Sequence, residues 1–173
     1  MKRTLWALAL ASLTGCQMMG DSGEAARATA GLDPTKGNKT RGEATFEQRG
    51  DKVHVVIYVE GLKPEQEHGL HLHEVGDCSS GDGMSAKGHF NPFGKPHGKP
   101  GTPERHAGDL PSLKAAKNGR AKVDVEVDGI SVTGGPGNII GKAVIVHAQP
   151  DDYTTQPTGN AGARLACGVI RAG

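Results

Sequence analysis

The stretch VHVVIYV, residues 53–59, sets the expectation for the fold. Its alternate residues, from Val53 to Val59, lie on one face of an extended chain and are β-branched, which is typical of a strand with one buried face. Similar short runs lie at residues 26–32, 43–48, 68–74, 121–127, 143–148 and 164–170. Gly and Pro separate these runs, and no long amphipathic helix is evident. The sequence therefore predicts an all-β sandwich or barrel.

Two segments interrupt this pattern of strands. Residues 77–112 are rich in Gly and Pro and contain no periodic apolar run, and a shorter Gly-containing segment spans residues 149–163. A long segment without regular structure inside a compact domain is usually either functional or disordered. The first segment also contains three His residues and an Asp that are candidate metal ligands, which favours a functional loop ordered by a bound ion.

Composition and charge exclude some classes of function. The chain has 173 residues, which suits one domain with its own core. Aromatic residues make up only 3% of it, so the core must be built from aliphatic side chains. The 20 basic and 19 acidic residues nearly balance, which gives no basis for nucleic-acid binding.

The first residues are similar to a bacterial targeting segment. A basic start precedes a short apolar stretch at residues 5–13, which is too short to span a membrane. The following LTGC, residues 13–16, resembles the lipobox at which bacteria cleave and acylate a cysteine; the alternative is a plain signal peptide with a chance cysteine. We therefore expect a lipoprotein signal peptide at 1–15, a lipidated tether at 16–25 starting with acylated Cys16, and a domain at 26–173.

Export has consequences for location and for the other two cysteines. Cys78 and Cys167 would lie in a compartment where disulfides persist, so we expect a bond between them, with two free thiols as the alternative. The expected location is the cell envelope, where a lipid on Cys16 attaches the protein to a membrane. Gln17 replaces the Asp that resembles an inner-membrane retention signal, which favours the periplasmic face of the outer membrane. Both a monomer and a homodimer remain compatible with the sequence.

Six of the eight histidines are candidate metal ligands. His71 and His73 are two residues apart on a predicted strand, so their rings project from one face. His147 ends another apolar strand, and the long Gly/Pro-rich segment contributes His89, His97, His106 and Asp109. Imidazole suits copper and zinc, and three His with one carboxylate suit tetrahedral zinc. Spacing alone, however, does not establish that the two groups meet.

Longer motifs carry a family resemblance. The segments GLHLHEVGDC (69–78), GHFNP (88–92), ERHAGDL (104–110) and GNAGARLACGVI (159–170) closely resemble the copper/zinc superoxide dismutases. GEATFEQ (42–48) and NIIGKAVIVH (138–147) match as well, so the resemblance covers residues 26–173, and the loop lengths are similar to those of the bacterial branch. It implies a Greek-key β-sandwich or flattened barrel of about eight antiparallel strands, in which two long loops form the active site. It also implies dismutation of superoxide to dioxygen and hydrogen peroxide, with copper and zinc as cofactors.

The resemblance further implies a role for each site residue. The copper ligands are matched by His71, His73, His89 and His147. The zinc ligands are matched by His89, His97, His106 and Asp109, so His89 would bridge the two ions and also transfer a proton. Arg164 matches the arginine that docks the anion, and Cys78 and Cys167 match the family disulfide. Asp151 matches the aspartate that links His71 to His97.

Two other histidines and two alternative functions complete the expectations. His68 is expected to brace the ligand strand through a backbone hydrogen bond, and His54 to face solvent. One alternative function is a non-catalytic copper/zinc-binding envelope lipoprotein, and the other is a structural or adhesive sandwich module. The presence of His89, Asp151 and Arg164 favours catalysis, because metal storage requires none of the three.

Overall fold

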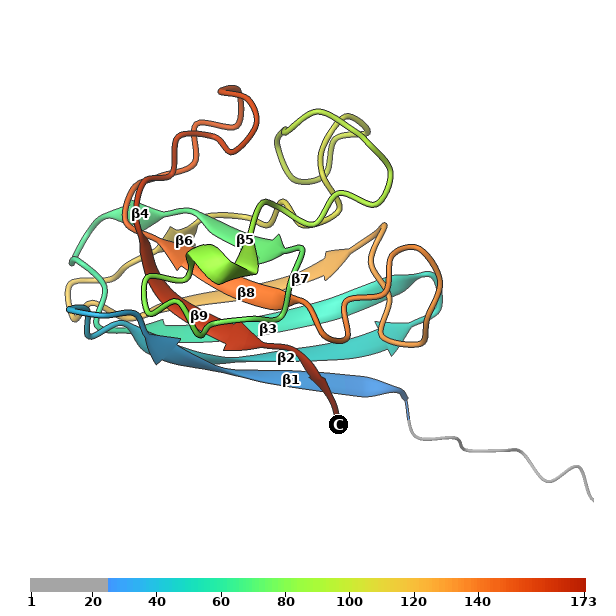
Figure 1. The fold of residues 1–173 in the computed structure, drawn as a ribbon, viewed down its shortest axis with the longest axis horizontal. Coiled ribbons are helices and arrows are strands. Elements are labelled where there is room, and N and C mark those ends of the chain that lie inside the picture. Colours follow the sequence, from blue (N-terminus) through green and yellow to red (C-terminus); the bar gives the residue numbers. More distant parts are fainter. Residues whose placement is uncertain (1–24) are drawn as a thin grey trace, which may run out of the picture.

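The computed structural model describes residues 25–173, and the expected signal peptide, the acylated Cys16 and the tether as far as residue 24 lie outside the described residues. The described part of the chain is built from strands (Figure 1). They are β1 (Arg27–Pro34), β2 (Arg41–Arg49), β3 (Lys52–Glu60), β4 (Glu67–His68), β5 (Leu70–His73), β6 (Leu113–Lys114), β7 (Ala121–Val127), β8 (Ala143–His147), β9 (Arg164–Val169) and β10 (Arg171–Ala172). Within this part the only helical element is the 3-10 turn η1 (Met84–Ala86), and no helix is long and apolar enough to cross a membrane.

Eight strands form one curled antiparallel sheet in the order β5-β8-β9-β1-β2-β3-β7, with β10 also paired to β1, while β4 and β6 form a separate two-stranded sheet. The sheet turns over at β1, whose first residues pair with β2 and whose last two, Asp33 and Pro34, pair with β9. In Figure 1 the strands β1, β2 and β3 lie along one side of the molecule, with β5 and β8 above them. The connections from β3 to β5 and from β7 to β8 cross between the two ends of the sheet, which gives Greek-key order. The expected fold class is confirmed.

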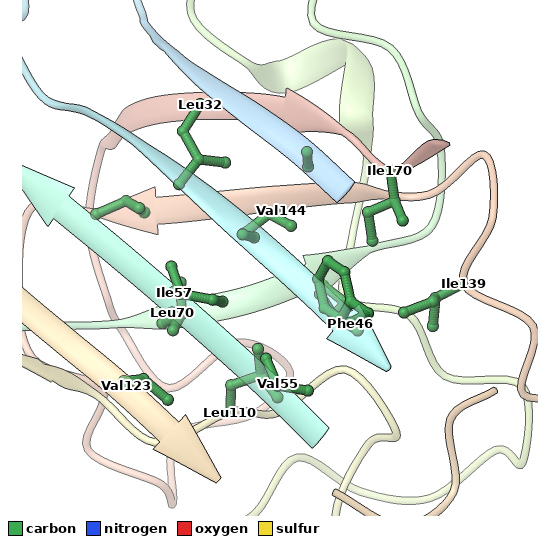
Figure 2. Close-up of a cluster of buried hydrophobic side chains, with 14 of the residues drawn as sticks. Leu32, Phe46, Val55, Ile57, Leu70, Leu110, Val123, Ile139, Val144 and Ile170 are labelled. Carbon is green, nitrogen blue, oxygen red and sulfur yellow. The ribbon is translucent and has the colours of Figure 1, made fainter. Parts of the chain in front are cut away.

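The core lies between the two halves of the curled sheet and is mostly aliphatic (Figure 2). Val53, Val55 and Ile57 of β3 are fully buried, whereas His54 on the other face hydrogen-bonds Asp124 near the surface. Phe46 of β2 is the largest of the fully buried side chains. The alternation along residues 53–59 therefore identified the buried face correctly.

Some predicted strand boundaries differ from the observed ones. The run at 68–74 is divided into β4 and β5 because the chain changes partners at Gly69. The strand β4 pairs with β6, a two-residue strand with no sequence signal, whereas β5 pairs with β8. A Cβ at Gly69 would lie 2.8 Å from the Cβ of Ala161, so the change of partner takes place where no side chain fits. The run at 164–170 corresponds to β9, which ends at Val169, and the short strand β10 follows it at Arg171–Ala172.

The second long loop and the later part of the first lie at the top of Figure 1, whereas the part of the first loop that carries η1 lies in front of β8. The first, residues 77–112, is connected to β9 by the predicted disulfide between Cys78 and Cys167, whose Cα atoms are 5.8 Å apart. It also covers the free edge of β5, because the amide of Phe90 donates to Leu72 and the amide of Leu72 donates to Gly108. The long loop thus extends the hydrogen bonding of the sheet beyond β5, the strand that contains His71 and His73.

Candidate metal centre

The histidines on strands come together because β5 and β8 are neighbours in the sheet. All four residues of β5 are buried, with Leu70 and Leu72 packed in the core and His71 and His73 on the opposite face, beneath the long loop. His147 ends β8, and its amide donates to the carbonyl of Gly69, immediately before β5. The side chains of β5 therefore alternate between two roles: the leucines fill the core, and the histidines on the other face supply imidazole rings.

A first cluster consists of His71, His73, His89 and His147, and we call it the four-histidine cluster. Each ring offers a nitrogen, and these four nitrogens lie within 4.8 Å of one another. Nδ1 of His71 and Nε2 of His89 are buried and have no hydrogen-bond partner among the described residues. Such orphaned polar atoms are costly and rare in proteins. Buried nitrogens that converge without partners fit a metal ion, and imidazole is a suitable ligand for copper.

The opposite nitrogen of each strand-borne ring is held by a hydrogen bond. His71 Nε2 lies 2.7 Å from Oδ2 of Asp151, His73 Nδ1 donates to the carbonyl of Lys87 over 2.8 Å, and His147 Nδ1 donates to that of Gly162 over 3.2 Å. A partner on one ring nitrogen fixes the tautomer and leaves the other nitrogen free to bind an ion. The described residues therefore orient these three rings toward one point.

A second cluster consists of His89, His97, His106 and Asp109, which we call the three-histidine–aspartate cluster. The Nδ1 atoms of the three rings lie 2.9, 3.0 and 3.4 Å from the same oxygen, Oδ1 of Asp109. The other carboxylate oxygen accepts the amides of Gly98 and His106. Three imidazole nitrogens and one carboxylate oxygen form a typical donor set for tetrahedral zinc. His89 belongs to both clusters, with Nδ1 in this one and Nε2 in the other.

Asp151 joins the two clusters from the second long loop. Its two oxygens lie 2.7 Å from Nε2 of His71 and 2.9 Å from Nε2 of His97. Burial opposes ionisation of Asp151, but the hydrogen bonds from these two rings outweigh it and hold the pKa of the carboxyl well below its usual range. The loop packs very closely here, because a Cβ at Gly159, where φ is +64°, would overlap Asp151 and would lie 2.5 Å from His97 Nε2.

The protonation of the histidines follows from burial and from the carboxylates. Burial lowers the pKa of His89 to about 4 and lowers the pKa values of His73 and His147 well below 6.5. These rings are therefore neutral near pH 7, which is the form that binds a metal. At His97 burial acts in the same direction, but hydrogen bonds to Asp109 and Asp151 outweigh it and raise the pKa to about 9.

The two remaining histidines have different surroundings. His68 is 1% exposed, and its Nδ1 donates to the main-chain carbonyl of His147 over 2.8 Å, so it contacts the ligand strand through a backbone hydrogen bond. His54 lies on the outer face of the sheet, 2.8 Å from Oδ1 of Asp124, and belongs to neither cluster.

A surface cleft of about 540 Å³ gives access to the four-histidine cluster, and we call it the histidine cleft. Its lining includes His73, His89, His147 and Arg164. The Arg164 guanidinium is held by two carbonyls, since Nη1 donates to Gly83 and Nη2 donates to Lys87, each over 2.6 Å. A guanidinium has five N–H donors, so donors remain for an anion that enters the cleft.

Comparisons with known proteins agree with this geometry. Residues 40–170 match the family model described as copper/zinc superoxide dismutase. The chain is 43% identical to a Cu-Zn superoxide dismutase of Paramecium bursaria Chlorella virus 1, over 75% of this chain and 72% of that protein. The chain belongs to the copper/zinc superoxide dismutase family.

Two other known proteins match a larger share of this chain. The chain is 39% identical to Superoxide dismutase [Cu-Zn] 2 of Aquifex aeolicus (strain VF5), over 84% of this chain and 86% of that protein. A solved structure titled as the clock protein EA4 is 44% identical and superposes with a TM-score of 0.77, covering 86% of this chain and 95% of that one. Dismutation of superoxide is thus the activity of this protein, and copper and zinc are its cofactors.

Sequence reasoning missed the groups that hold Arg164 in the dismutase. They are main-chain carbonyls, at Gly83 and Lys87, and the Lys87 carbonyl also accepts from His73. Carbonyl groups are common to all residues, so no motif marks them. Lys87 also has φ +62° and ψ −143°, a conformation that is uncommon for a residue with a side chain. One main-chain oxygen therefore fixes the arginine relative to a histidine of the cluster.

Proposed function

We propose that the dismutase divides its two metals between the two clusters, with copper in the four-histidine cluster, zinc in the three-histidine–aspartate cluster and the ring of His89 between them. The main support is the environment of that ring. Nε2 of His89 is buried without a partner and faces the four-histidine cluster, whereas Nδ1 lies 2.9 Å from Oδ1 of Asp109 in the other cluster. A carboxylate, which suits zinc better than it suits copper, occurs only in the second donor set.

The side chains around the histidine cleft then perform distinct tasks. Copper, when bound, supplies the one-electron couple of the reaction, whereas zinc has no redox chemistry. Arg164 binds the superoxide anion and holds it beside His73 and His147, because its guanidinium is fixed by two carbonyls and remains cationic. His89 takes up a proton at Nε2 in one half of the cycle and gives it to the peroxide in the other, and solvent water supplies the second proton of hydrogen peroxide.

Selective loss of metal tests the division between the clusters. His73→Gln should lower copper content and leave zinc in place, His106→Gln should do the reverse, and His89→Gln should weaken both. Metal content is measured by elemental analysis after dialysis against equimolar copper and zinc. Equal loss of both metals in the His73 and His106 variants would contradict the assignment.

Two observations disfavour a protein that binds metals without turnover. Membership of the family supports catalysis, and Arg164 beside the histidine cleft has no use in storage. Superoxide consumption by the fully metallated chain, compared with the metal-free chain, separates the two functions. A rate equal to the metal-free control would support storage.

The proposed location is the cell envelope, with the protein anchored through a lipid on Cys16 at the periplasmic face of the outer membrane. The support comes from the apolar stretch and the LTGC sequence at residues 13–16. Acylation of this cysteine with more than one fatty-acid chain suffices for stable membrane anchoring. Mass spectrometry of the mature N-terminus should find an acylated Cys16, and Cys16→Ser should release the protein from the membrane fraction. An unmodified N-terminus at another residue would refute the anchor.

A further inference from the structure

Gln156, in the second long loop, makes a two-point contact with the main chain of His97. Its Oε1 accepts the His97 amide over 2.8 Å, and its Nε2 donates to the His97 carbonyl over 2.9 Å. The Nε2 group also donates to the carbonyl of Thr154 over a longer 3.4 Å. His97 itself is 3% exposed, so the pair of hydrogen bonds satisfies two buried main-chain groups with one side chain. We call this pair the amide clamp.

The amide clamp completes the fixation of His97. Both nitrogens of the ring already face carboxylates, with Nδ1 3.0 Å from Asp109 and Nε2 2.9 Å from Asp151. These contacts orient the ring but do not hold the amide or the carbonyl of His97. The clamp holds both of these main-chain groups. A ligand whose main chain is held needs less ordering when an ion binds.

Hydrogen bonds within the second loop fix the position of Gln156. Oδ1 of Asp152 accepts the amides of Thr154 and Thr155 over 2.9 and 2.8 Å, and Oδ2 accepts the Thr155 hydroxyl over 2.6 Å. The amide of Gly159 then donates to the carbonyl of Thr155 over 2.7 Å. This turn places Gln156 opposite His97. Asn160 and Gly162 follow in the same loop and line the histidine cleft.

We propose that Gln156 is a positioning residue for the zinc half of the centre. By holding the main chain of His97 it raises the affinity for zinc, and by the same contact it ties zinc binding to the loop that forms one wall of the histidine cleft. The inference rests on the assignment of zinc to the three-histidine–aspartate cluster. Coupling of this kind is reciprocal, so zinc also stabilises the position of the cleft wall.

The test compares two variants of Gln156 with a matched control in the full chain. Gln156→Ala removes both hydrogen bonds, and Gln156→Glu keeps an acceptor for the His97 amide but loses the donor for its carbonyl. The control is Gln48→Ala, because Gln48 also joins two connecting segments through main-chain contacts, at Val132 and Gly50, and belongs to neither cluster. Zinc affinity is measured by competition with a chromogenic chelator, and bound Co²⁺ reports the ligand geometry in its visible spectrum. Urea unfolding of the metal-free proteins measures fold stability separately.

Gln156→Ala should weaken zinc binding about tenfold or more, in the range found for residues that orient metal ligands. Gln156→Glu should give a smaller loss, and both should alter the Co²⁺ spectrum. Gln48→Ala should leave zinc affinity and the spectrum unchanged even where it lowers fold stability. Unchanged zinc affinity in Gln156→Ala, or an equal loss in Gln48→Ala, would overturn the positioning role. Failure of the wild-type chain to bind zinc, or retention of zinc by His106→Gln, would instead overturn the metal assignment.

Discussion

Asp151→Asn tests how strongly the link between the clusters holds both metals. The carboxylate accepts from His71 at 2.7 Å and from His97 at 2.9 Å, and all three side chains are buried. An asparagine offers one oxygen and one NH₂ group, so one ring would meet an acceptor and the other would meet a donor. The variant therefore loses one charge-assisted hydrogen bond and places two donors against each other.

The loss of such a bond costs about 1.5–3 kcal/mol, and a tenfold change in affinity corresponds to about 1.4 kcal/mol. We therefore expect affinity to fall roughly 10–100-fold for the metal whose ligand loses its acceptor. The assay is metal release from the loaded protein to chelators specific for copper and zinc. Asp124→Asn is the matched control, because Asp124 contacts His54 at 2.8 Å on the outer face of the sheet. Release of both metals at the wild-type rate in Asp151→Asn would refute the reasoning.

Four further predictions concern the anion site, the disulfide, the metal-free protein and the core. Arg164→Ala should lower kcat/KM by roughly 10–100-fold, as expected for loss of electrostatic focusing, while elemental analysis finds unchanged metal content; unchanged turnover at low salt would remove Arg164 from the mechanism. Replacing Cys78 and Cys167 together by Ser should lower the free energy of unfolding by about 4–5 kcal/mol in urea, because the disulfide closes a long loop; a change below about 1 kcal/mol would contradict this. In the metal-free protein the pKa of His97 is raised from 6.5 to about 9, so its contribution to stability is complete below pH 6.5 and is lost as the pH rises through about 9; a flat urea midpoint between pH 6 and 10 would count against it. Phe46→Ala should cost about 3–5 kcal/mol by the same measurement, since Phe46 is 1% exposed in the core.

The fold and the ligand set could be predicted because each follows from a local pattern. Alternation along residues 53–59 indicated the buried face of β3 without knowledge of its partners. His71 and His73 follow the same rule, since residues two apart on a strand share a face. The bond between Cys78 and Cys167 was expected from export and matched the family motifs, and the structure contains it.

The features that sequence did not predict depend on groups without a sequence signature. Strand β6 has only two residues and is defined by its pairing with β4, so it is too short to show a periodic sequence pattern. The contacts that hold Arg164 come from carbonyls of the first long loop. The amide clamp relies on Gln156, a residue type that is mostly found on protein surfaces, and on a contact between two loops about 60 positions apart. The location of the protein stays a prediction, because Cys16 lies outside the described residues.

The pairing of β1 has a consequence for the order in which the molecule is completed. The first strand to be synthesised pairs with β2, but also with β9 and β10, so Ala28 lies opposite Ala172 and Asp33 opposite Cys167. A chain that emerges with its N-terminus first therefore cannot finish this sheet until Arg171 and Ala172 have been added. Such long-range pairing slows folding. The sheet therefore stays open during most of synthesis, and metal loading must come afterwards.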